Sequence, residues 1–248
     1  MIDKNQVELS VVGKISDIGE QDWDACASNG YDGRQPEDPF VSYRFLKGLE
    51  DSKSVGAGTG WVPQYIIAKY DKKIIGVMPS FAKGHSQGEY IFDHNWAHAY
   101  ENAGGKYYPK LQISVPFTPV TGRRFLTISG YHDIAQSALL EGLKIIVSQQ
   151  KWSSAHITFC SAEEFKLGKD LGLLQRIGQQ FHWENRNYKN FDEFLINLSS
   201  RKRKNIRKER RIAANFGGTF HQFTGDEIKL EHWEAFWNFY IDTGNRKW

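Results

Sequence analysis

Apolar and polar residues alternate along residues 7–15, a pattern that predicts a first strand. Residues 16–27 follow with a Ser or Asp cap and the spacing of an amphipathic helix. A second helix is predicted over residues 39–53, where aromatic and leucine side chains fall on one stripe. The start of the chain therefore combines one strand with two helices.

The clearest strand pattern is a hairpin. Two runs rich in β-branched and aromatic residues, 65–70 and 74–78, flank a polar turn at residues 71–73. The glycine-rich residues 54–61 precede it. A phosphate-binding glycine turn needs a strand before it and a helix after it, so these glycines predict a flexible connection instead.

The remaining patterns alternate between helix and strand. Residues 131–150 form the longest amphipathic pattern and predict a helix, and residues 153–160 predict a buried strand. A helix is then predicted from Ser161, with acidic residues in its first turn, and a pair of strands over residues 173–185. This order predicts an α/β chain, an α+β mixed sheet with an antiparallel front and a βαβ back.

The composition is that of a folded protein. The chain has 248 residues, of which 40% are hydrophobic and 14% aromatic, which allows one large domain or one domain and part of another. Cys26 and Cys160 form no disulfide framework, and no apolar run is long enough for a membrane span. The N-terminus also lacks an apolar signal core, so the sequence predicts a cytoplasmic protein.

Positive charge is concentrated in residues 199–211. This segment holds eight basic residues and one acid, whereas the whole chain has a net charge of only +3. A DNA-binding protein more often spreads its positive charge over a whole face, so DNA is not expected as a partner. On a helix, Arg203, Arg207 and Arg210 would share one face, and the basic first turn would oppose the helix dipole by ~0.3–1 kcal/mol per cation. An anion site and a solvated charged face both stay open.

A second candidate site lies in the aromatic and proline-rich residues 107–124. Lys110, Arg123 and Arg124 are cations within this segment, and Gly122 allows a close approach of the backbone. The cations predict a site for a diphosphate or carboxylate group of a substrate. The alternative is a loop that packs on its own aromatic side chains.

Long stretches of the sequence resemble one bacterial family. They are PFVSYRFLKGLEDSKSVGAGTGWVPQYIIAK, GEYIFD, WAHAYENAGGKYYPKLQISVPFTPVTGRR, QFHWEN and the basic core RKRKNIRK. These stretches are similar to FemAB-like predicted N-acyltransferases, the family labelled peptidoglycan biosynthesis/recognition. Residues 167–185 resemble part of the GNAT acyltransferase fold. The resemblance runs from about residue 39 to the end of the chain.

This resemblance implies two GNAT-like domains. Residues 1–187 would form the first domain. Residues 188–248 would hold a linker, the basic helix and the start of a second domain that the chain leaves incomplete. Residues 230–248 agree with that expectation, because their aromatic helix pattern has an apolar face that needs a partner.

The resemblance also implies transfer of an acyl or aminoacyl group to an amine. The donor would be acyl-CoA or aminoacyl-tRNA, with no tightly bound cofactor, and the acceptor an anionic molecule such as a cell-wall precursor. The match in the basic core makes Arg203, Asn205 and Arg207 candidate substrate-binding residues. At residues 119–133 the usual pyrophosphate loop of GNAT enzymes is absent, which argues against a CoA site in the first domain.

Acyl transfer to an amine requires a group that takes up the ammonium proton. Asp93 and Glu89 are the candidate proton acceptors, with His94 as a third, and the alternative for each carboxylate is a structural hydrogen bond. His94 and His98 have helical i, i+4 spacing, but no third ligand is marked, so no metal is expected. No nucleophile stands beside a supporting base, which favours direct transfer without a covalent enzyme intermediate.

Two other functions stay open. One is a recognition module that keeps the fold without catalysis. The other is an RNA- or tRNA-binding protein in which the basic helix contacts phosphates and aromatic side chains stack on bases.

Overall fold

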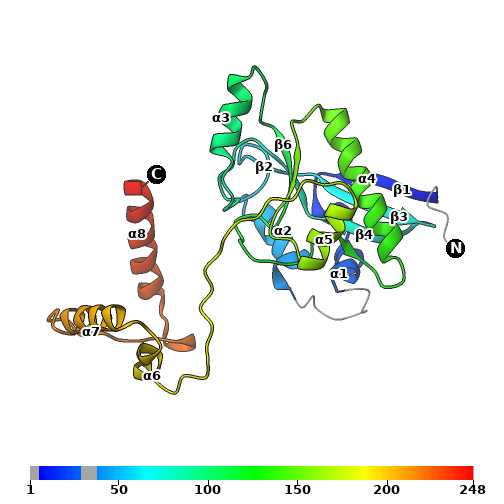
Figure 1. Cartoon of the computed structure of the whole chain (residues 1–248). Helices are drawn as coiled ribbons and strands as arrows, with labels where there is room; N and C mark the ends of the chain where they lie inside the picture. Colours follow the sequence, from blue (N-terminus) through cyan, green and yellow to red (C-terminus); the bar gives the residue numbers. More distant parts are fainter. Residues whose placement is uncertain (1–5, 29–37, 248) are drawn as a thin grey trace. The chain divides into compact units, whose positions relative to one another are not determined.

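The chain divides into two compact units in the computed structural model, which describes residues 6–28 and 38–247 (Figure 1). The first unit spans Met1–Ile177 and the second Gly178–Trp248. The assignment of residues 1–187 and 188–248 to two GNAT-like domains stays a prediction.

Two four-stranded sheets form the centre of the first unit. The antiparallel first sheet has the order β1-β3-β4-β7, and its strands are β1 (Val7–Val12), β3 (Tyr65–Tyr70), β4 (Lys73–Met78) and β7 (Leu126–Thr127). The second sheet has the order β2-β5-β6-β8, and its strands are β2 (Trp61–Pro63), β5 (Ser80–Lys83), β6 (Lys110–Ile113) and β8 (Ala155–Ile157). Its last pair, β6 and β8, is parallel.

The first unit also contains helices. They are α1 (Glu20–Ala27), α2 (Tyr43–Asp51), α3 (His94–Asn102), α4 (His132–Gln150) and α5 (Ala162–Asp170), with short 3₁₀ turns at Ile15–Asp17 and Pro39–Val41. Helix α4 packs on β1, β3 and β4, and α1 packs on β4 and β7. Gly142 permits the close packing of α4, since a Cβ there would lie 2.9 Å from Cγ2 of Ile66.

The mixed α/β class and most predicted elements are confirmed. The hairpin pairs Tyr70 with Lys73, and its turn residues Asp71 and Lys72 have φ angles of 47° and 63°, the left-handed conformation that tight hairpin turns favour. The predicted helix at residues 131–150 is α4. Helix α5 begins with a capping box, a reciprocal pair of hydrogen bonds between Ser161 and Glu164, as in other stable helix starts.

One prediction is wrong: residues 173–185 form no strand pair. After α5 the chain continues without regular structure, and the side chains of Leu174, Ile177 and Phe181 are almost fully exposed. Their apolar spacing resembles a strand, but a strand also needs a neighbouring edge that satisfies its N–H and C=O groups. No described strand pairs with this segment, so the local pattern does not become a sheet.

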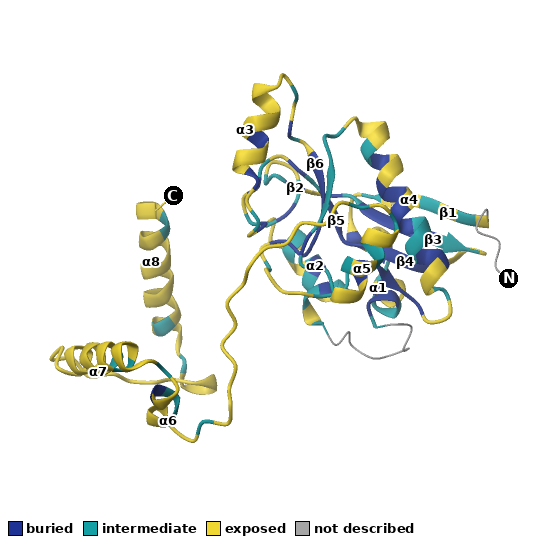
Figure 2. Cartoon of the chain, viewed as in Figure 1, coloured by how far each residue is buried: buried dark blue, intermediate teal, exposed yellow. Residues whose placement is uncertain are grey.

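The second unit consists of helices in its described residues. They are α6 (Phe191–Ile196), α7 (Ser200–Ala214) and α8 (Leu230–Lys247), with a 3₁₀ turn at Gly225–Glu227. Ser199 caps α7 by accepting a hydrogen bond from the backbone N–H of Lys202. Leu195 is buried, whereas α7 and α8 are mostly exposed and hold no buried residue (Figure 2). Among the described helices, none is long and apolar enough to cross a membrane.

Candidate functional site

A cluster of charged side chains is buried at the first residue of β6. The ammonium of Lys110 donates to Oε2 of Glu89 at 2.8 Å and to Oδ2 of Asp93 at 2.5 Å. The exposed fractions of these residues are 0%, 4% and 1%. Buried charges persist in proteins when they are paired, so this ion cluster is part of the packed interior. The sequence predicted all three as candidate site residues, but it did not predict the ion pairs between them.

The register of the second sheet brings the cluster together. Lys110 lies directly opposite Lys83 on β5, and Gln112 lies opposite His156 on β8. Successive side chains of a strand point to opposite faces, so Lys110 and Gln112 share one face of the sheet. His156 extends that face, and its Nδ1 lies 3.2 Å from Oδ2 of Asp93. The second sheet therefore presents a polar face where an apolar one is usual.

Asp93 is the residue with the most partners in the ion cluster. It stands at the N-terminal cap of α3, but its side chain makes no capping bond and turns to Lys110, His156 and Arg176 instead. The Arg176 guanidinium donates to Oδ1 at 2.5 Å. Burial alone would raise the pKa of Asp93, but hydrogen bonds from these three partners hold that pKa well below its ordinary value. Asp93 is therefore a fixed anion.

Glu89 behaves in the opposite way. Burial raises the pKa of its carboxyl group, the charge of Asp93 adds to the rise, and Lys110 and Lys83 oppose it. Its Oε1 has no hydrogen-bond partner among the described residues, although the atom is buried. Two carboxyl groups on one ammonium thus have pKa values shifted in opposite directions, an arrangement that separates a fixed anion from a proton acceptor.

Lys83 is a second buried lysine beside the ion cluster, and no sequence pattern predicted it as a site residue. Its Nζ lies 3.7 Å from the centre of a Trp61 ring and donates to the carbonyl of Gln87 at 3.0 Å. Burial lowers the pKa of Lys83 to about 7; Glu89 opposes the change and Lys110 adds to it. Lys83 is the last residue of β5 (Ser80–Lys83), and a lysine at the end of a strand is the signal that could have found it.

Arg123 and Arg124 do not join the ion cluster. The Arg124 guanidinium is fully buried and donates to the carbonyls of Thr158, Val120 and Arg123 at 2.8–3.0 Å. Glu164 accepts from the backbone N–H groups of Arg124 and the next residue. These bonds tie the segment before β7 to β8 and α5, which is a structural role. Arg123 donates to the carbonyl of Ala27. Substrate binding by this pair stays a prediction that the geometry does not favour.

The two histidines of α3 lie outside the ion cluster. His94 stacks on Phe92 with the ring centres 5.6 Å apart. Within the described ranges, no group of three or more His, Cys, Asp or Glu side chains could hold a metal ion.

The predicted basic helix is α7 of the second unit. Arg203 donates to the carbonyl of Ile196 at 3.3 Å, Arg207 lies 3.5 Å from Asp192, and the Arg210 guanidinium lies 4.2 Å from the ring centre of Phe191. The arginine face that the spacing predicted therefore packs toward α6. Asn205 is exposed. Also exposed are the basic residues of α7 whose side chains make no ion pair, hydrogen bond or ring contact in the described part of the chain: Arg201, Lys202, Lys204, Lys208 and Arg211.

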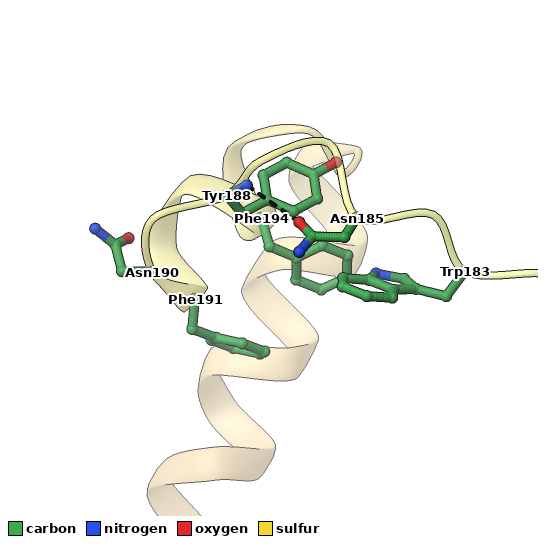
Figure 3. A pocket seen from close by; sticks show the side chains of 6 residues that line it. All are labelled: Trp183, Asn185, Tyr188, Asn190, Phe191 and Phe194. Carbon is green, nitrogen blue, oxygen red and sulfur yellow. Dashed lines mark hydrogen bonds between the residues drawn. The ribbon is translucent and has the colours of Figure 1, made fainter.

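An aromatic pocket of about 300 Å³ lies beside α6 (Figure 3). Its lining residues are Trp183, Asn185, Tyr188, Asn190, Phe191 and Phe194. The rings of Tyr188 and Phe194 pack edge to face at 5.6 Å, and Asn185 accepts a hydrogen bond from the backbone N–H of Tyr188. Apart from the phenol of Tyr188, no lining side chain can exchange a proton. The pocket therefore offers an aromatic surface with few groups for proton transfer.

The fold is mixed α/β, and its first unit holds a buried site of paired charged side chains. Residues 14–248 match the profile of the FemAB-like family, described as peptidoglycan biosynthesis/recognition. Since the match covers nearly the whole chain, the protein belongs to the FemAB-like family. A search of curated proteins finds no match.

Solved structures to which the chain is similar include several N-acetyltransferases. A ribosomal-protein-alanine N-acetyltransferase from Brucella melitensis biovar Abortus 2308 is 11% identical, with 72% of this chain and 98% of that chain covered and a TM-score of 0.41. A glucosamine-6-phosphate N-acetyltransferase from Arabidopsis thaliana is 12% identical, with 71% and 97% covered and a TM-score of 0.40.

Proposed function

We propose that the protein is an N-acyltransferase that moves an activated acyl or aminoacyl group directly to the amine of a cell-wall precursor. The observation that carries this proposal is the pair of buried carboxyl groups on Lys110, whose pKa values are shifted in opposite directions. Membership of the FemAB-like family supports the acceptor class. No side chain of the ion cluster is a serine or cysteine nucleophile, which supports direct transfer.

The reaction assigns a role to each carboxylate. The acceptor arrives as an ammonium, and Glu89 takes one of its protons because its raised pKa makes it a better base than an ordinary carboxylate. The amine lone pair attacks the acyl carbonyl, a C–N bond forms, and the C–S bond of a thioester or the C–O bond of an ester breaks. The second ammonium proton leaves with the thiolate or alkoxide, and the proton on Glu89 passes to solvent.

Asp93 and Lys110 are positioning residues in this scheme. Asp93 stays anionic and fixes Lys110, His156 and Arg176 through its two oxygens. Lys110 in turn holds Oε2 of Glu89, so that Oε1 remains for the proton. Such preorganisation is a main source of rate enhancement in transfer reactions.

The basic helix α7 is proposed to bind the anionic part of a substrate. Arg203, Asn205 and Arg207 are the candidates from the sequence, and the exposed cations of the same helix add charge. The first turn is basic and holds no acid, although an acid there would stabilise the helix. A bound phosphate at this end would remove that conflict.

The test is mass spectrometry of the protein incubated with acyl-CoA, aminoacyl-tRNA and peptidoglycan precursors that carry a free amine. The expected product is the acylated precursor. Changing Glu89→Gln removes the proton acceptor and is expected to lower the rate by about 10²–10⁴-fold. Lys47→Ala, which alters an exposed lysine, is the matched control and should leave the rate unchanged. The absence of transfer from every donor would overturn the proposal.

A second candidate function is RNA binding, which the exposed basic residues of α7 and the aromatic pocket favour. Titration with a single-stranded RNA at several salt concentrations separates the two functions. RNA binding by many phosphate contacts predicts a steep loss of affinity with salt. Weak RNA binding at every salt concentration, together with acyl transfer, would contradict RNA binding and support the enzyme function.

A further inference from the structure

Three buried polar atoms lack a hydrogen-bond partner among the described residues: Oε1 of Glu89, Oε1 of Gln112 and Oγ of Ser114. The exposed fractions of the three residues are 4%, 0% and 3%. An unsatisfied buried polar atom destabilises the fold, so each one calls for an explanation.

The three atoms belong to β6, to the residue that follows it, and to the carboxylate that Lys110 of β6 holds. Lys110 and Gln112 are alternate residues of β6, and Ser114 directly follows the strand. The backbone N–H of Ser114 donates to the carbonyl of Pro79 and continues the pairing with β5, so the three side chains fall on one face of the second sheet. Glu89 is held over this face by the ammonium of Lys110, through its other oxygen. The amide nitrogen of Gln112 donates to Oγ1 of Thr158 at 2.8 Å, which leaves the amide oxygen as the free atom.

The chemistry of these atoms is that of a site for N–H donors. A carboxylate oxygen and an amide oxygen only accept hydrogen bonds, and a serine hydroxyl oxygen also accepts them. A primary ammonium offers three N–H donors, one for each oxygen, and its positive charge suits the carboxylate.

We propose that Glu89, Gln112 and Ser114 bind the amino group of the acceptor substrate. The inference rests on the proposed acyl transfer and deepens it, because it places the reacting nitrogen on the carboxylate that takes its proton. Gln112 and Ser114 then select a primary amine and hold it, while Glu89 alone exchanges the proton. Since all three atoms are buried, entry of the amine requires the segment that carries Glu89 to move.

The binding test uses methylammonium as the probe. Calorimetric titration compares it with tetramethylammonium at the same ionic strength, because the second cation has the same charge but no N–H group. Methylammonium is expected to bind and tetramethylammonium to give no heat. Ser114→Ala and Gln112→Met are each expected to weaken methylammonium binding about tenfold, the effect of one lost hydrogen bond.

Ser80→Ala is the matched control. Ser80 is a buried serine on the neighbouring strand β5, but its hydroxyl already donates to the carbonyl of Gln64, so methylammonium affinity should not change. Equal binding of both cations, or equal weakening in Ser80→Ala and Ser114→Ala, would overturn the subsite. A crystal structure with water on all three atoms at saturating methylammonium would do the same.

The kinetic readout separates this inference from the proposed function. In an active preparation, Ser114→Ala should raise KM for the amine acceptor about tenfold and leave KM for the donor unchanged. Acyl transfer with no change in the acceptor KM of either variant would refute the subsite and keep the function. Specific methylammonium binding without transfer from any donor would keep the subsite and refute the function.

Discussion

The two units of this protein use charged side chains in opposite ways. In the first unit, Lys110 joins two carboxylates at 2.5 and 2.8 Å in the interior. In the second unit, Arg207 meets Asp192 at 3.5 Å, and both side chains are exposed. The same pairing of cation and carboxylate is strong in a poorly screened interior and weak in water.

This difference teaches where each charge acts. The removal of Lys110 leaves the buried carboxylate of Glu89 without its hydrogen-bond partner, so stability and function are tied together there. The removal of an exposed cation of α7 that makes no ion pair, such as Lys204 or Lys208, leaves only solvated groups behind, so that part of the charge is not needed for folding. This positive charge is therefore available to bind an anionic partner.

The largest expected effect is the loss of Lys110. Lys110→Met leaves Glu89 and Asp93 buried without their shared ammonium and should lower the free energy of unfolding by about 3–5 kcal/mol, measured by urea denaturation. Adding Glu89→Gln to this variant removes one of the stranded charges and should restore part of the loss.

Lys47→Met is the control, because Lys47 pairs with Asp51 at the surface. Its expected cost is below about 1 kcal/mol. A cost for Lys110→Met no greater than that of the control would break the contrast between buried and exposed pairs.

The second effect is a pH dependence centred on Asp93. Its pKa is lowered in the folded chain, so its ionised form stabilises the fold above the ordinary Asp pKa of about 3.9, and this stabilisation is lost as pH falls. Asp93→Asn should cost about 1.5–3 kcal/mol at neutral pH, the range for hydrogen bonds to a charged group, and less at pH below about 4. Unfolding curves at several pH values measure this difference.

The contribution of Glu89 to stability is expected to change with pH in the opposite direction. Its pKa is raised in the folded chain, so its contribution to stability is present at low pH and is lost as pH rises through the raised value. The stability of Glu89→Gln relative to the unaltered chain should therefore increase with pH. Parallel pH profiles for Asp93→Asn and Glu89→Gln would contradict the assignment of one fixed anion and one proton acceptor.

A smaller effect concerns the first turn of α7. Arg201→Glu places an acid where the helix dipole favours one and should stabilise α7 by about 0.3–1 kcal/mol, as seen in its thermal melting by circular dichroism. The same change in the last turn, Arg211→Glu, should destabilise it. Arg201→Glu should also weaken binding of pyrophosphate. Unchanged pyrophosphate binding would indicate that the basic turn is only a solvated face.

Local signals predicted most of the fold, and the distant pairing of strands was not predictable. The hairpin, α4, and the capping box of α5 depend on residues a few positions apart, so the sequence marked them. The segment 173–185 has apolar spacing typical of a strand but finds no neighbouring edge. Whether such a segment joins a sheet depends on residues far away in the chain.

The candidate site was predictable in its residues and not in its contacts. Glu89 and Asp93 were marked as proton acceptors, and Lys110 was marked only as an anion-binding cation. Their meeting depends on the register that places Lys110 opposite Lys83 and beside β8, some 45 residues further along the chain. For the same reason His156, although it contacts Asp93, gave no signal in the sequence.

The smallest expected effect is the most direct test of the exposed charge. Arg207→Ala removes an ion pair between exposed side chains and should change the free energy of unfolding by less than about 1 kcal/mol, with no difference left at high salt. Its affinity for pyrophosphate at low salt should fall, because one cation of the proposed anion site is gone. Arg246→Ala, which removes a comparable exposed pair with Asp242 on α8, is the control and should keep pyrophosphate affinity. A loss of stability near that of Lys110→Met would mean that α7 depends on its arginine face for folding, and the contrast between the two units would disappear.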